Sequence, residues 1–107
     1  MMSSYSAMTD FEIDAAVAAI IHPGRKITNF AGEAVVWFGN LETLVVRYCN
    51  SWADAGPIIQ RKEINILFNW NEDGIHGASA GFPHKDHEDK NPLRAAMIVF
   101  LMMQGKA

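Results

Sequence analysis

The sequence is short of cysteine and of long apolar runs. Its one cysteine, Cys49, cannot form an internal disulfide, which fits a reducing cytoplasm. The longest apolar run covers only residues 95–103, whereas a membrane-spanning helix needs about 20 apolar residues. The first residues also lack the basic segment and apolar core of a signal peptide. We therefore expect an intracellular protein with no membrane partner.

Basic residues are also few, since nine Lys and Arg face twelve Asp and Glu and leave a formal charge of −3. Nucleic-acid-binding domains usually carry a basic stripe that releases counterions from phosphates. The acidic balance therefore argues against nucleic acid as the main partner. Two basic pairs, Arg25–Lys26 and Arg61–Lys62, form a phosphate-contacting patch only if the fold unites them beside an exposed tryptophan. The alternative is a solvated basic face over core aromatics.

The remaining composition is ordinary for a globular domain, because half of the 107 residues are apolar and a fifth are charged. A chain of this length buries roughly two-thirds of the surface that it exposes when unfolded, so it needs no metal or disulfide to fold. We expect a single domain, 1–107. Residues 1–8 are polar, small and without periodicity, and we expect them to form a loose leader.

Two helix starts are visible before the last third of the chain. Thr9 has Glu12 at the capping-box spacing, which predicts a first helix directly after it. Ser51 is able to cap a second helix over about 52–62. Proline in a helix interior removes a hydrogen bond and clashes with the preceding turn, so Pro57 predicts a kink or a new first turn.

The final helix has the clearest start, with Asn91 as its cap and Pro92 in its first turn. Its apolar block, 95–103, covers most of the circumference, so we expect it to be covered on most sides. Core packing is the default, and a homodimer contact through this helix is the alternative. Arg94 opposes the helix dipole near the start, and we expect it to pair with an acidic residue in 86–89.

Strand signals are runs rich in branched and aromatic residues, bounded by turn residues. Two hairpins are predicted, 34–38 with 44–49 and 64–70 with 75–81. Residues 27–30 fit either a short strand or an extended connection, and 82–90 fit a polar loop. The predicted order is α-β-β-α-β-β-α, an α+β fold. Its antiparallel sheet of about four strands carries the helices on one face.

One cluster has the residue types of a metal site, with His84, His87 and three acidic neighbours, and with His76 upstream. Zinc requires several ligands in fixed geometry, whereas these residues lie in a predicted loop without cysteine or helical spacing. We interpret the cluster as a solvated polar loop and expect no metal and no other cofactor.

Motifs for catalysis are not apparent. Cys49 lies in a strand-like apolar run without a histidine or basic partner, which indicates a small core residue. The sequence has no P-loop, no dinucleotide fingerprint and no serine in an elbow motif. Its acidic residues are scattered. We therefore predict no catalytic residue and favour a protein that is not an enzyme.

Three segments, in the same order, resemble the NinX-like family of small proteins from lambdoid phages and enterobacterial prophages. The first is Phe-Glu-Ile-Asp-Ala-Ala-Val-Ala at 11–18, and the third is Asn-Pro-Leu-Arg-Ala-Ala-Met at 91–97. The second and most specific is Tyr-Cys-Asn-Ser-Trp-Ala-Asp-Ala-Gly-Pro-Ile-Ile at 48–59, followed by Ile64 and Ile66. The resemblance implies a phage or prophage origin and a bacterial cytoplasm, and it supplies no catalytic residue.

We therefore predict a phage accessory protein that binds a host or phage protein. Its predicted surface comprises Trp52, Asp54, Gly56 and Pro57, although the same motif could serve only to fix the turn into the second helix. The alternative function is weak nucleic-acid binding near phage replication or recombination, through the two basic pairs.

Overall fold

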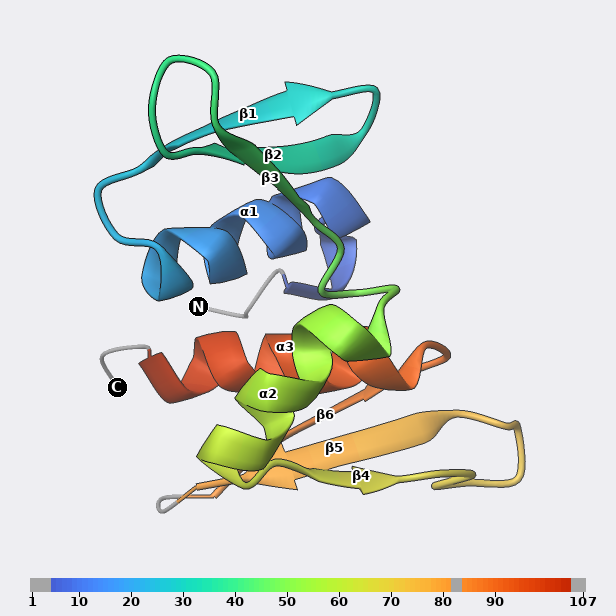
Figure 1. The fold of residues 1–107 in the computed structure, drawn as a ribbon. Coiled ribbons are helices and arrows are strands. Elements are labelled where there is room, and N and C mark those ends of the chain that lie inside the picture. Colours follow the sequence, from blue (N-terminus) through green and yellow to red (C-terminus); the bar gives the residue numbers. More distant parts are fainter. Residues whose placement is uncertain (1–4, 82–83, 105–107) are drawn as a thin grey trace.

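The computed structural model describes residues 5–81 and 84–104 (Figure 1). The helical elements are η1 (Tyr5–Ala7), α1 (Asp10–Ile21), α2 (Trp52–Lys62) and α3 (Pro92–Gln104). The strands are β1 (Lys26–Phe30), β2 (Glu33–Trp37), β3 (Thr43–Val46), β4 (Asn65–Leu67), β5 (His76–Ala80) and β6 (Lys85–Asp89). None of the described helices is long and apolar enough to cross a membrane.

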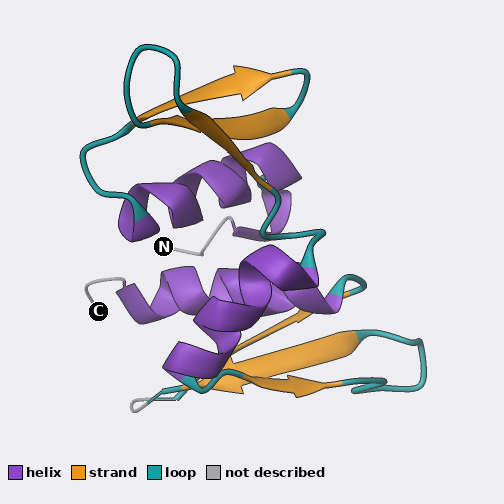
Figure 2. Ribbon diagram, viewed as in Figure 1, coloured by secondary structure: helices purple, strands orange, loops and turns teal. Residues whose placement is uncertain are grey.

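The chain has an α+β fold with two three-stranded antiparallel sheets, in the orders β1-β2-β3 and β4-β5-β6. The element order is α-βββ-α-βββ-α, so the prediction of one sheet of about four strands was wrong. Figure 2 shows the helices between the two sheets. α1 packs on the first sheet, α3 packs on the second, and the two helices pack on each other. Each sheet therefore carries one helix on one face.

α1 starts as its capping box predicts. Thr9 Oγ1 accepts the N–H of Glu12 at 3.1 Å, and Glu12 Oε1 accepts the N–H of Thr9 at 2.8 Å. These bonds satisfy two of the N–H groups that a helix start leaves without partners. Ile13, Val17 and Ala18 are fully buried on the face that packs on the first sheet and α3.

The first sheet contains one more strand than the predicted hairpin, because residues 26–30 pair with β2. Val36 in the central strand lies between Ile27 of β1 and Leu44 of β3. The segment that fitted either a strand or a connection is therefore an edge strand. Ala34, Val36 and Val46 form the buried face of this sheet, against α1.

The second sheet contains the predicted hairpin and a further strand, β6, in a segment that was predicted to be a polar loop. The sequence of β6, Lys-Asp-His-Glu-Asp, carries no apolar pattern of its own. It is a strand because it pairs with β5, in register His87 to Ala78. Charged residues are tolerated at a sheet edge and protect that edge from further pairing.

α3 lies in the centre of the molecule. Asn91 Oδ1 accepts the N–H groups of Leu93 at 2.9 Å and Arg94 at 3.3 Å, as its predicted role as N-cap requires. Every side chain from Ala95 to Leu101 is buried within the single chain. The apolar surplus of this helix is thus used internally, and residues 93–101 leave no exposed apolar face for a homodimer contact.

Candidate functional site

A groove of about 200 Å³ runs between α2 and β3, next to the last residue of α1. Its walls are mostly apolar, with Ile21, Leu44, Val46, Ala53, Pro57 and Ile58. Its polar side chains are Tyr48, Asp54 and Arg61. Leu44 remains 43% exposed in the groove wall. The groove therefore presents open apolar surface, with a carboxylate and a guanidinium in its lining.

One wall of the groove is a single face of α2. Asp54, Pro57, Ile58 and Arg61 follow one another at helical spacing, which places them on the same side. Ser51 caps the helix as predicted, since its Oγ accepts the N–H of Asp54 at 3.3 Å. Asp54 therefore lines the groove and also donates its backbone N–H to the capping side chain.

α2 continues through Pro57 as one helix, so the predicted restart at this proline was wrong. Pro57 lies in the second turn and leaves only the carbonyl of Ala53 without its helical N–H donor. The residue before a proline normally avoids helical geometry, because its Cβ and its N–H crowd the proline ring. Gly56 has no Cβ, which allows helical geometry there. The Gly56–Pro57 pair thus allows the backbone of α2 to stay helical through the proline.

The loop from β3 to α2 is held by side chains from three other places in the chain. Asp14 Oδ1 of α1 accepts the N–H of Cys49 at 2.9 Å. Asn91 Nδ2, at the start of α3, donates to the carbonyl of Cys49 at 2.6 Å. Asp54 Oδ2 of α2 accepts the N–H of Arg47 at 2.8 Å. These bonds fix the position of α2 relative to β3, and therefore the width of the groove.

Asp14 is the one buried charged residue of the described core, and it is only 4% exposed. Burial raises its pKa from 3.8 to about 6, against the opposing effect of the hydrogen bonds from Cys49. The folded protein therefore binds a proton at Asp14 more tightly than the unfolded chain does. The stability that this proton contributes is present below about pH 4 and is lost as the pH rises through about 6.

We expect Asp14→Asn to remove this dependence, because its amide does not titrate while the amide oxygen still accepts the N–H of Cys49. Relative to the variant, the natural protein should lose at most about 3 kcal/mol of unfolding free energy between about pH 4 and pH 7. Urea unfolding of both proteins across that range measures the difference. A difference that stays constant with pH would contradict the raised pKa of Asp14.

β3 is an edge strand with its backbone open on one side. The N–H of Phe38 donates to the carbonyl of Glu42 at 2.8 Å, which fixes the alternation of bonds along the β2–β3 ladder. Thr43 and Val45 consequently direct their N–H and C=O groups away from β2. The N–H of Arg47 points the same way, and it is the group that Asp54 accepts. The open edge therefore ends at α2.

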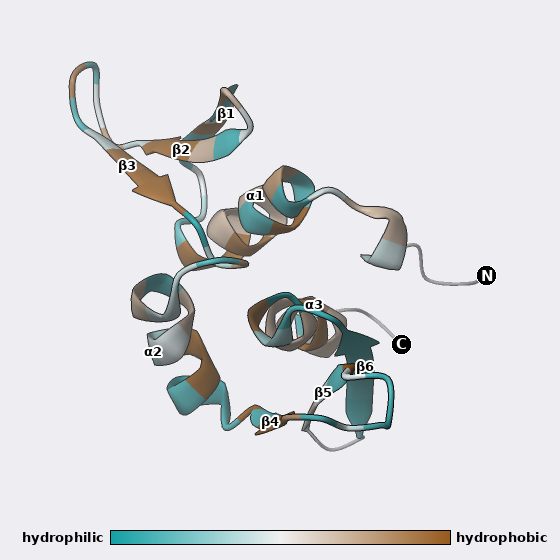
Figure 3. Ribbon diagram, turned by 90° about the vertical axis from the view of Figure 1, so that its right-hand side faces the viewer, coloured by the Kyte–Doolittle hydropathy of each residue, from teal (hydrophilic) through white to brown (hydrophobic). Residues whose placement is uncertain are grey.

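A second hollow, of about 290 Å³, lies on the outer face of the same sheet. Phe30, Val35, Trp37 and Val45 contribute its apolar lining. Side chains alternate between the two faces of a strand, so β3 contributes Leu44 to the groove and Val45 to the outer hollow. Figure 3 shows β3 as a hydrophobic strand at the free edge of its sheet. A chain paired to that edge would find apolar surface on both of its faces.

The predicted partner-binding residues separate into two surfaces. Asp54 and Pro57 line the groove, as described above. Trp52 points elsewhere, with its ring 6.5 Å from that of Phe68, and it is 53% exposed. Phe68 in turn contacts the ring of His76 at 5.4 Å, so these three rings form an aromatic cluster beside the second sheet.

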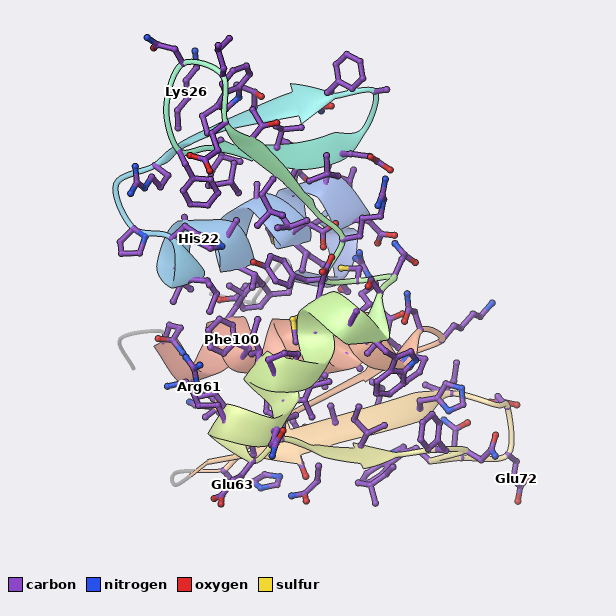
Figure 4. All side chains as sticks on the ribbon, in the orientation of Figure 1. His22, Lys26, Arg61, Glu63, Glu72 and Phe100 are labelled. Atoms are coloured by element: carbon purple, nitrogen blue, oxygen red, sulfur yellow. The ribbon has the colours of Figure 1, made fainter. Side chains whose placement is uncertain are left out.

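The two basic pairs also lie apart. Arg25 and Lys26 line a hollow at the end of the first sheet, whereas Arg61 lines the groove. Figure 4 shows Lys26 beside the first sheet and Arg61 on α2, with the end of α1 between them. The united basic patch on which the nucleic-acid prediction depended does not form. Among the described residues, neither Arg61 nor Lys62 has an ion-pair partner.

The histidine cluster does not assemble within the described chain, where no three His, Cys, Asp or Glu side chains are placed to hold a metal ion. His84 instead contacts Asp86 at 2.9 Å on the surface. His87 points inward from β6, and its buried Nε2 has no hydrogen-bond partner among the described residues. Burial lowers the pKa of His87, which favours the neutral ring. The two histidines therefore do not share one site.

Cys49 is fully buried, and burial together with the neighbouring Asp14 raises the pKa of its thiol well above the ordinary range. Because the thiolate is the reactive form, we expect negligible reaction with a disulfide reagent in the folded protein and rapid reaction in urea. Absorbance after mixing measures both rates. Similar rates in the two states would show an accessible, ionised thiol.

The model of the family described as "Bacteriophage P22, NinX" matches residues 4–104 of the chain. A search of curated proteins gave no match. The match includes all three segments that carry the resemblance noted in the sequence, and all the described helices and strands. The chain therefore belongs to the phage P22 NinX family.

Proposed function

We propose that this phage protein is a non-catalytic accessory protein that acts in the bacterial cytoplasm by binding a host or phage protein along β3. Membership of the NinX family supports the phage context. The observation that carries the binding proposal is the open edge of β3, with an apolar hollow on each face of the sheet beside it. Such an edge accepts an extended segment of another chain, whose alternate side chains enter the two hollows.

The other sheet edges, unlike β3, have features that discourage pairing with another chain. β1 begins with Lys26, and β6 consists of charged residues and one histidine. β4 covers only Asn65–Leu67. β3 has the sequence Thr-Leu-Val-Val, without charge or proline. Edges without such protection pair readily with other chains, which supports β3 as the proposed binding edge.

The groove also indicates the chemistry of the partner segment. The segment is extended and apolar at alternate positions, so that one side faces Leu44 and Pro57. Arg61 has no ion-pair partner in the described chain, so an acidic residue of the segment would complement it. Pairing stops before Arg47, whose N–H is already bonded to Asp54. A contact this short suits a transient complex.

Val45→Pro tests strand pairing directly, because it removes an N–H that faces the partner and spares the bonds between β3 and β2. Val45→Thr is the matched control, since it keeps the N–H and nearly the same shape. Each protein is used to capture partners from infected or lysogenic cells, and the captured proteins are quantified by mass spectrometry. We expect Val45→Pro to lose the partner and Val45→Thr to keep it.

Two further variants serve as additional comparisons in this test. Leu44→Glu introduces a charge at a half-exposed groove position and should also abolish capture. It provides a second test of the same surface if Val45→Pro lowers the melting temperature of the protein. Trp52→Ala, in the aromatic cluster, should leave capture intact. If Trp52→Ala releases the partner while both β3 variants retain it, the binding surface is the aromatic cluster and the β3 proposal is wrong.

A further inference from the structure

The hollow that contains Arg25 and Lys26 lies at the end of the first sheet, between the α1–β1 turn and the β2–β3 loop, and has a volume of about 420 Å³. Figure 4 shows Lys26 beside that loop. Its lining includes two consecutive aromatic residues, Trp37 and Phe38, and Gly39 beside them. This hollow is separate from the β3 groove, because the two have no lining residue in common.

Its charge is entirely positive, because no lining residue is acidic. The guanidinium of Arg25 lies 5.2 Å from the ring centre of Phe38, and the ammonium of Lys26 lies 5.7 Å from that of Trp37. Arg25 also donates to the carbonyl of Phe38 at 3.4 Å. By contrast, Arg47 and Arg94 both form ion pairs with carboxylates.

Contacts with aromatic rings hold both cations in the lining of the same hollow, in a protein whose formal charge is −3. Neither Arg25 nor Lys26 has a carboxylate partner in the described chain, so an anion would supply one. Arginine and lysine are the usual ligands of phosphate oxygens. Aromatic side chains bind the flat faces of bases without regard to sequence.

We infer that this hollow binds a nucleotide, with its phosphate on Arg25 and Lys26 and its base against Trp37 or Phe38. The volume lies within the range of roughly 300–1,000 Å³ that is common for small-molecule sites. The nucleotide is either a free mononucleotide or one unit of an exposed single strand. Both sources present the same phosphate and base, and a short strand would extend past the open rim.

Titration of the full chain, labelled with nitrogen-15, tests the inference. The probes are thymidine 5′-monophosphate, a short oligothymidylate, inorganic phosphate and thymidine, each at low salt. The signals that report are the Gly39 amide and the indole N–H of Trp37, which donates to Thr28 Oγ1 at 2.9 Å. We expect both signals to move with either nucleotide probe, and thymidine or phosphate alone to bind about tenfold more weakly.

Arg25→Gln/Lys26→Gln should weaken the binding of thymidine 5′-monophosphate about tenfold or more. The control Lys62→Gln/Lys90→Gln removes the same charge from exposed positions outside both hollows and should leave binding within about twofold. If oligothymidylate binds more tightly than thymidine 5′-monophosphate and its affinity falls with added salt, the source is a single strand. If the two affinities are equal, the source is a free nucleotide.

Three results overturn the inference. The first is no movement of the Trp37 and Gly39 signals with any probe. The second is binding of inorganic phosphate as tight as that of the nucleotide, which would remove the role of the aromatic rings. The third is an equal loss of affinity in Lys62→Gln/Lys90→Gln, which would show that the weaker binding comes only from the change in net charge.

Discussion

Replacing Arg94 by alanine is expected to lower the free energy of unfolding by about 3–5 kcal/mol. Its side chain is 12% exposed and forms ion pairs with Asp89 at 2.9 Å and with Asp10 at 2.8 Å. The same guanidinium donates to the carbonyls of Tyr5, Ser6 and Met8. It therefore joins the end of β6, the start of α1 and the η1 segment. Truncation would leave the carboxylate of Asp89, itself only 17% exposed, without its cation.

The effect of Arg94 is measured by urea unfolding, with two comparisons. Arg94→Lys keeps the charge but cannot reach both carboxylates and the carbonyls together, so it should recover only part of the loss. Arg47→Ala removes an ion pair to Glu33 with bond lengths of 2.7 and 2.8 Å, but both side chains are exposed and little change is expected. Equal effects at Arg94 and Arg47 would mean that the Arg94 network is not buried.

Phe100→Ala is the second large change, with an expected loss of about 3–5 kcal/mol. Phe100 is 1% exposed and is the largest fully buried side chain of α3, the helix that packs on α1, α2 and the second sheet. The cavity would therefore weaken the contact between both halves of the molecule. Phe100→Leu, which keeps most of the volume, should cost less than about 1.5 kcal/mol.

Chemical unfolding of the two Phe100 variants, followed by fluorescence and by circular dichroism, provides the measurement. For a single cooperative domain the two signals should change together in each variant. A loss below about 1 kcal/mol in Phe100→Ala would place this residue outside the core, against its burial in the structure.

The helices were predictable because their signals are local. Thr9, Ser51 and Asn91 each cap the helix that follows, and the apolar block of α3 indicated a covered helix. Arg94 pairs with Asp89, within the predicted acidic segment. The number of sheets was not predictable, because periodicity identifies strands and not their partners. β6 shows this most clearly, since its residues form a strand only through pairing with β5.

The candidate site was predictable only in part. Asp54 and Pro57 of the predicted surface do line the groove, because helical spacing places them on one face of α2. Leu44, Val46 and Ile21 were missed, since their position opposite α2 depends on the path of the chain between distant elements. One signal was present in the sequence, namely a strand without charge or proline. Its meaning depends on knowing that β3 is an edge.

The most direct test of binding along β3 is amide hydrogen exchange of Thr43 and Val45, measured with and without the captured partner. We expect exchange at both amides to slow about tenfold or more on binding, because their N–H groups then donate to the added strand. Ile27 and Asn29, on the opposite edge of the same sheet, should be unchanged. Protection elsewhere on the protein, with Thr43 and Val45 exchanging as before, would contradict the account.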